Sequence, residues 1–110
     1  MHEHVLAKLE YPAILDLLGH HCRFSVAAEK ARELGPSGDV PTVAYLLEVT
    51  AEAVDLLTEF PDVTIGGARD VRTTVQRAAK GARLQPGELL QVLDMVAAGR
   101  NLRRALLRLP

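Results

Sequence analysis

The sequence predicts an all-α fold, in which about five helices form a small bundle and a long C-terminal helix projects from it. Two observations lead to this prediction. Apolar residues recur at every third or fourth position along most of the chain, which is the period of an amphipathic helix. Clusters of proline and glycine divide these stretches into helix-sized lengths. The one β-like run, residues 63–65, is too short to build a sheet.

The composition suits a single small domain formed by residues 1–110. Hydrophobic residues make up 48% of the 110 positions and charged residues 25%, which argues against wholesale disorder. Apolar runs fall well short of the roughly 20 residues that cross a bilayer, and the N-terminus lacks a signal-peptide pattern, so no membrane partner is expected. A single cysteine, Cys22, excludes an internal disulfide, and we expect a reduced, cytoplasmic protein.

The first two expected helices are short. Pro12 fits the first turn of one helix, and its missing N–H costs nothing there. The apolar stripe of that helix contains Ile14, Leu17 and Leu18. A second helix is expected over residues 25–34, with Ser25 as its N-cap and a glycine just past its end.

The third expected helix, residues 41–60, has the clearest pattern. Asp39 is its expected N-cap, and Pro61 ends it because the residue before a proline is pushed out of the α region. Its apolar side is formed by Val43, Leu46, Leu47, Thr50, Val54, Leu57 and Phe60. An acidic side is formed by Glu48, Glu52, Asp55 and Glu59. The helix is therefore amphipathic.

Two further helices complete the prediction. Residues 68–80 are expected to form a helix with small apolar residues on its inner face, namely Val71, Val75, Ala78 and Ala82. Residues 86–109 are expected to form a last helix of roughly 35 Å, long enough to project beyond the core. Its second half carries a basic row, Arg100, Arg104 and Arg108.

Charge is distributed unevenly along the chain. The net charge of −1 combines −6 in residues 1–60 with +5 in residues 61–110. A basic segment in the second half provides the candidate nucleic-acid contacts, Arg69, Arg72, Lys80 and Arg83, with Arg77 in the same segment. Such a row can follow a phosphate backbone without reading bases. The alternatives are a solvated face, or pairing with the acidic side of residues 41–60.

No residue is expected to be catalytic, to bind a cofactor or to bind a metal. The metal-like clusters, His20-His21-Cys22 and His2-x-His4, do not provide three or four ligands that converge on one point. The pair Gly66-Gly67 lacks the Lys-Ser/Thr of a nucleotide-binding loop. The chain by itself is therefore not expected to be an enzyme.

Six motifs, in order and with the right spacing, resemble the bacterial MutS-type-two family from about Leu9 to Leu107. They are LEY at 9–11 with IL at 14–15 and LL at 17–18, AREL at 31–34 followed by Pro36, the periodic residues of the 43–57 helix, GGARDVR at 66–72, RAAKG at 77–81 and LQPGELL at 84–90. Each motif is weak alone, and the set is fairly specific.

The resemblance implies that this is the N-terminal helical core segment of a longer protein, with a lever or connector role. The chain would be truncated before that protein's lever, ATPase and nuclease domains. It further implies that the parent binds ATP and Mg²⁺ in an ATPase domain outside this chain and acts as an endonuclease. The implied partners are the rest of the same chain, a second copy in a homodimer, branched or duplex DNA, and ribosomal RNA. The family is associated with restraining recombination and with stalled ribosomes.

Three functions remain open at this point. The segment transmits nucleotide-driven movement to a DNA- or RNA-binding clamp, it contacts nucleic acid non-specifically, or it is a stand-alone helical adaptor. The dense leucines at the end of the chain, Leu102, Leu106, Leu107 and Leu109, favour a truncated protein, because an apolar stripe of this kind needs a partner. We expect residues beyond Pro110, or another copy of the chain, to cover it.

Overall fold

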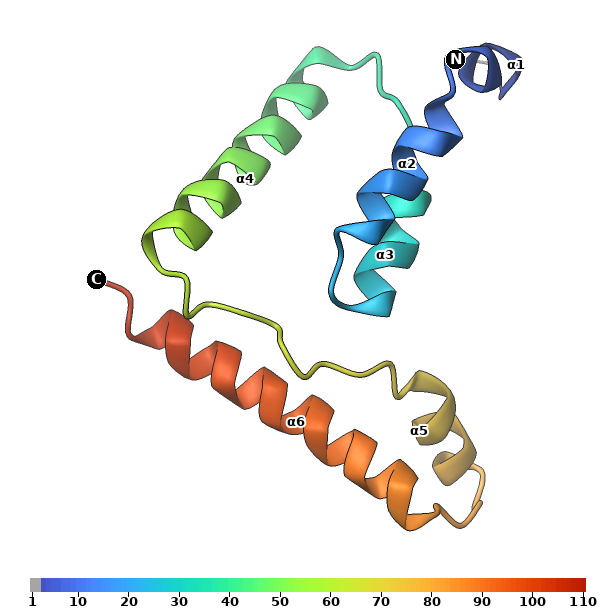
Figure 1. Cartoon of the computed structure of the whole chain (residues 1–110), viewed down its shortest axis with the longest axis vertical. Helices are drawn as coiled ribbons and strands as arrows, with labels where there is room; N and C mark the ends of the chain where they lie inside the picture. The colour runs from blue at the N-terminus through green and yellow to red at the C-terminus, as the bar shows by residue number, and fades with distance from the viewer. Residues whose placement is uncertain (1–2) are drawn as a thin grey trace.

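In a computed structural model that describes residues 3–110, the chain consists of helices joined by short segments without strands (Figure 1). The helices within these residues are α1 (Glu3–Lys8), α2 (Tyr11–His20), α3 (Ser25–Arg32), α4 (Val40–Glu59), α5 (Arg72–Ala79) and α6 (Pro86–Leu107). The predicted all-α class and the long last helix are confirmed. The short helix α1 is additional to those expected.

Helices α2 and α3 form a closely packed antiparallel hairpin, with α1 beside α2 (Figure 1). Gly19 of α2 is buried against α3, where a Cβ atom would lie 2.9 Å from the guanidinium carbon of Arg32. Ala28 and Ala31 fill the other side of this contact. Small residues therefore let the two helix backbones approach closely.

The starts of α3 and α4 differ in how they are capped. Ser25 is the first residue of α3 and not its N-cap, contrary to the prediction, because Phe24 holds the extended N-cap position and no side chain caps the helix. The predicted N-cap of α4 is confirmed, since an Asp39 carboxylate oxygen accepts a hydrogen bond from the Thr42 backbone N–H at 3.2 Å.

Helix α4 lies apart from the other helices in Figure 1. None of its residues is buried, and Leu46, Leu47 and Val54 of its apolar side are each more than half exposed. The amphipathic pattern of α4 therefore exists, but most of its apolar side is exposed within residues 3–110, with Leu57 near its end lining a cleft shared with other segments.

Residues 60–71 form an irregular segment that runs along α6 (Figure 1). Val63 and, on α6, Ala98 are buried, at 6% and 5% exposure. Gly67 adopts φ = +90°, a conformation that glycine tolerates and side chains resist. Its turn brings the glycine close to Ala98, where a Cβ at position 67 would lie 3.9 Å from the alanine Cβ. This segment provides the main packing of α6 against the rest of the chain.

Helix α5 begins at Arg72, four residues later than predicted. The Asp70 carboxylate accepts the Arg72 backbone N–H at 3.2 Å, an Asx-type turn that starts the helix after it. The predicted inner face is only partly correct, because Val71 is partly buried whereas Val75 is 51% exposed. Gly81, at φ = +89°, then turns the chain toward α6.

The overall arrangement is open. The radius of gyration is 17.8 Å, whereas about 13 Å is typical of a compact chain of this length. The buried apolar residues among 3–110 are Ala28, Ala31, Val63 and Ala98. Close packing between helices is chiefly that of α1, α2 and α3, so the apolar sides of α4 and α6 remain available for further contacts.

Candidate nucleic-acid interface

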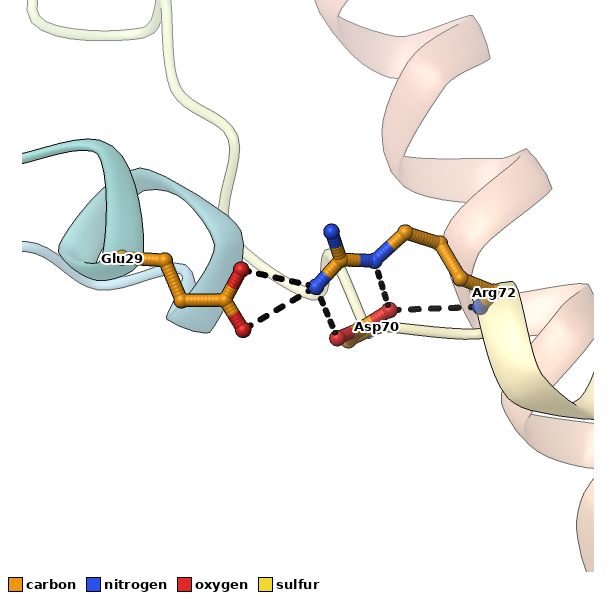
Figure 2. A network of polar contacts seen from close by, with 3 residues as sticks. All are labelled: Glu29, Asp70 and Arg72. Atoms are coloured by element: carbon orange, nitrogen blue, oxygen red, sulfur yellow. Dashed lines mark hydrogen bonds and ion pairs between the residues drawn. The ribbon is translucent and has the colours of Figure 1, made fainter. Parts of the chain in front are cut away.

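Arg72 is the centre of a polar network that links α3 to the start of α5 (Figure 2). Its Nη2 atom donates to both carboxylate oxygens of Glu29, at 3.0 and 2.9 Å, and to Asp70 Oδ2 at 2.8 Å. Its Nε atom donates to Asp70 Oδ1 at 2.9 Å. One guanidinium group thus holds two carboxylates that lie 41 positions apart in the sequence.

This network changes the pKa values of Asp70 and Arg72. The Arg72 side chain, followed by the Arg72 backbone N–H, lowers the pKa of Asp70 to about 2. In return, Asp70 and then Glu29 raise the pKa of Arg72. Hydrogen bonds to two carboxylates therefore already occupy the guanidinium group of Arg72.

Two other arginines of the basic segment are also paired. Arg69 lies before α5 and approaches Asp94 of α6, with Nε and Oδ2 3.7 Å apart. Arg77 donates to Glu88, whose pKa is lowered first by the Gln85 backbone N–H and then by Arg77. These contacts fasten the basic segment to α6.

The four predicted contact residues therefore lie in different settings. Arg69 and Arg72 are in ion pairs, whereas Lys80 follows α5 and Arg83 lies in the loop before α6. Lys80 and Arg83 are exposed and form no ion pair within residues 3–110. Because Arg69 precedes α5 and Arg83 follows it, the four do not form one row on one helix. Whether they bind nucleic acid stays a prediction.

The alternative that the basic segment pairs with acidic residues holds in part, though these acidic residues are not the expected ones of residues 41–60. The ion-pair partners of Arg69, Arg72 and Arg77 come from α3, α6 and position 70. The acidic side of α4 takes part in no ion pair within residues 3–110. The charged side of α4 is thus left to solvent.

The basic row expected from the sequence was Arg100, Arg104 and Arg108, and the structure groups Arg103, in place of Arg108, with Arg100 and Arg104. Arg100, Arg103 and Arg104 of α6, together with Leu107, surround a cavity of about 200 Å³. All three arginines are exposed and unpaired within the described part of the chain. The signal that identifies them is the lack of any acidic residue after Asp94.

The largest cleft lies where the α2–α3 loop, the end of α4, the irregular segment and α6 meet. It measures about 550 Å³ and is lined mainly by apolar side chains such as Leu57, Ile65 and Leu102, with Cys22 at one side. The Cys22 thiol donates to the Leu18 carbonyl at 3.6 Å. His21 and Arg23 also line the cleft beside Cys22, and the rest of its lining is apolar apart from Thr64.

The histidine clusters lie at two places in the N-terminal part of the chain, with His20 ending α2, His21 following it and His4 in α1. His20 and His21 are not joined by further ligands, and among residues 3–110 no three His, Cys, Asp or Glu side chains are placed to hold a metal ion. His2 of the other cluster lies outside the described residues. None of the helices in the described range combines the length and apolar character of a membrane span.

The chain is similar to several proteins named Endonuclease MutS2. The protein of Thermomicrobium roseum is 48% identical over 104 residues, that of Symbiobacterium thermophilum 36% over 106, and that of Clostridioides difficile 35% over 106. These matches cover 94%, 96% and 96% of the chain, which spans only 13% of the length of each relative. No protein-family model and no solved structure matches the chain.

Proposed function

Since this chain belongs to the MutS2 family and matches its N-terminal region, we propose that it is the N-terminal helical core of a cytoplasmic MutS2-type nucleic-acid enzyme. In this proposal the segment carries no chemistry of its own. It connects an ATPase to a clamp that binds DNA or RNA, and its helices transmit movement between them.

The observation that carries the proposal is the unpartnered apolar side of α4. Val40 is 76% exposed, Leu47 66% and Val54 58%, on a helix of 20 residues that would be about 30 Å long. A helix of this kind owes most of its stability to packing of its apolar side. We propose that the rest of a MutS2-type protein covers this side.

The mechanical role is supported by how the two long helices are joined. Helices α4 and α6 are connected through residues 60–71, which lie on α6 around Val63 and Gly67. The ion pair of Arg69 with Asp94 and the Arg72 network attach the following residues to α6 and α3. A displacement of α6 would therefore be passed to α3 and α4 through this segment.

The chemistry of the parent would lie outside these residues. The Gly66-Gly67 turn does not fit an ATP site, because it lies against Ala98 of α6 and is followed by Ala68-Arg69 and not by the Lys-Ser/Thr of a phosphate loop. ATP with Mg²⁺, the nuclease residues and the contacts of a homodimer belong, in this proposal, to the remainder of the protein. A role in restraining recombination or rescuing ribosomes would follow from that remainder.

Hydrogen exchange tests the proposal. We expect the amides of α4 to exchange quickly in the 110-residue chain alone and to be protected in the complete polypeptide that the gene encodes. Adding ATP should change the protection of α4 and α6 in the complete polypeptide. A gene that stops after codon 110, or equal exchange of α4 in both samples, would exclude the core role and favour a stand-alone adaptor.

A further inference from the structure

One face of α6 changes character halfway along the helix. In its first half the outward residues are apolar, with Leu89 at 55%, Leu93 at 60% and Val96 at 52% exposure. In its second half the same face carries Arg100, Arg103 and Arg104, and then Leu107. The opposite face, with Ala98 and Leu102, packs toward residues 60–71. The arginines therefore point away from the rest of the chain.

These arginines repel one another without compensation. Arg100 is three residues from Arg103 and four from Arg104, and like charges at these spacings destabilise a helix. The favourable dipole at the end of α6 acts only within the last turn and so does not reach Arg100. A bound anion would remove this repulsion.

Arg108 is in a different setting. It lines a separate cavity of about 170 Å³ together with Glu59 and Asp62. Neither residue forms an ion pair with Arg108 at 4 Å or less. The cavity beside Arg108 thus has acidic residues in its lining, whereas the cavity beside Arg100, Arg103 and Arg104 has none.

We propose that Arg100, Arg103 and Arg104 bind the phosphate backbone of a nucleic-acid duplex without reading its sequence. The fork-shaped guanidinium group suits phosphate oxygens, and the three arginines are exposed on one face of α6 without a carboxylate partner in the described residues. Residues 61–110 contain no aromatic side chain, so the surface cannot stack the bases of a single strand. The choice of a nucleic acid over other polyanions rests on the proposed function.

The salt dependence of binding tests this site in the complete polypeptide that the gene encodes. Each phosphate contact contributes about −0.9 to the slope of log affinity against log salt. R100Q/R103Q/R104Q should therefore make the slope for a labelled duplex shallower by about 2.7 and weaken binding roughly tenfold or more. The change in slope counts only the contacts removed, so other contacts in the polypeptide do not mask it.

Two variants serve as matched controls. R100K/R103K/R104K keeps three positive charges and should keep the slope. K8Q/R23Q/K30Q removes the same number of positive charges from exposed positions on α1, on α3 and between α2 and α3, none of them a proposed nucleic-acid contact, and should change the slope little. A slope that is unchanged in R100Q/R103Q/R104Q, or changed equally in K8Q/R23Q/K30Q, would overturn the proposal.

A photo-crosslinker on α6 tests which part of this helix contacts the duplex. Leu107 borders the arginine cavity, and Leu89 lies about five turns earlier on the same face, about 27 Å away. Benzoylphenylalanine at 107 should crosslink to a DNA or RNA duplex, and at 89 it should not. No crosslink from 107 to a duplex, or stronger binding of the R100/R103/R104 surface to polyglutamate than to a duplex, would assign the surface to protein contacts.

The salt-dependence test of the phosphate site and the hydrogen-exchange test of the core role can give opposite results, so each proposal can fail without the other. If α4 becomes protected in the complete polypeptide but the slope does not change, the core role stands and the phosphate site is wrong. If the slope changes while α4 stays unprotected, the arginines bind duplexes on a segment that is not a packed core.

Discussion

The arginines around α5 and those near the end of α6 carry the same charge and lie in different electrostatic settings. Arg69, Arg72 and Arg77 each have a carboxylate partner from another part of the chain. Arg100, Arg103 and Arg104 have none within residues 3–110. The comparison teaches that a basic row in a sequence becomes a candidate binding surface only where the fold does not bring carboxylates to it.

The largest expected effect comes from loosening the segment that places the paired arginines. Val63→Ala should lower the local stability of residues 60–71 by about 2 kcal/mol, because Val63 is buried on α6. Hydrogen exchange of residues 63–72 measures this. The matched change Val75→Ala, at a half-exposed valine, should cost less than about 0.5 kcal/mol. Equal effects of the two changes would mean that residues 60–71 do not dock on α6.

The Arg72 network can be broken directly. Arg72→Gln removes the group that lowers the pKa of Asp70, which should rise from about 2 toward the ordinary value of about 3.9. Carbon-detected NMR titration of the Asp70 carboxyl measures the change. Arg100→Gln is the control and should leave the Asp70 pKa where it is, because Arg100 touches no carboxylate in the described residues. A pKa near 3.9 in the unaltered chain would contradict the network.

Acid should release the paired region before it affects the unpaired one. The pKa of Asp70 is lower when folded than when unfolded, so its stabilising contribution is complete above about pH 4 and is lost as the pH falls toward about 2. Protection of the α5 amides should fall over that range. In Asp70→Asn this part of the pH dependence should disappear. Persistence of the same acid transition in Asp70→Asn would assign it to other carboxylates.

The smallest expected effect converts one paired arginine into an unpaired one. Asp94→Asn leaves Arg69 without its partner and should change stability by at most about 0.5 kcal/mol, since both side chains are more than half exposed. If the ion pair with Asp94 keeps Arg69 from contacting phosphate, the slope of log affinity against log salt for a duplex should become steeper by a little under 1 in this variant. Asn101→Asp, which adds a carboxylate beside the α6 arginines, should act in the opposite direction. No change of slope in either variant would break the comparison between the two groups.

Much of the local structure could be predicted from the sequence. The spans of α4 and α6 were expected to within about two residues at each end, because proline and the Asp39 cap mark their boundaries. The start of α5 was missed, since Asp70 was taken as an early helical residue and its carboxylate instead turns the chain before Arg72. Ser25 likewise fits both the cap and the first turn of a helix by residue type alone.

The candidate site was predictable only in part. The residue types of the basic segment were evident, but the partners of Arg69 and Arg72 were not. Asp94 lies 25 positions from Arg69, and Glu29 lies 43 positions from Arg72. The Arg100 group could have been ranked higher from sequence, since the last acidic residue of the chain is Asp94. The net charge of residues 61–110 taken together does not distinguish the arginines of the basic segment, which have acidic residues nearby, from those that follow Asp94.

The sequence by itself determined the helical class, the helix limits set by proline and capping residues, and the kinship with Endonuclease MutS2 proteins, because these depend on neighbouring residues and on motif order. The tertiary structure decided which arginines are paired and which apolar faces are left open. Leu93 and Leu102 both belong to the apolar pattern of α6, yet Leu93 is 60% exposed while Leu102 lines the cleft of about 550 Å³. The reason is physical: pairing and burial depend on distances between residues far apart in the chain, which local periodicity does not specify.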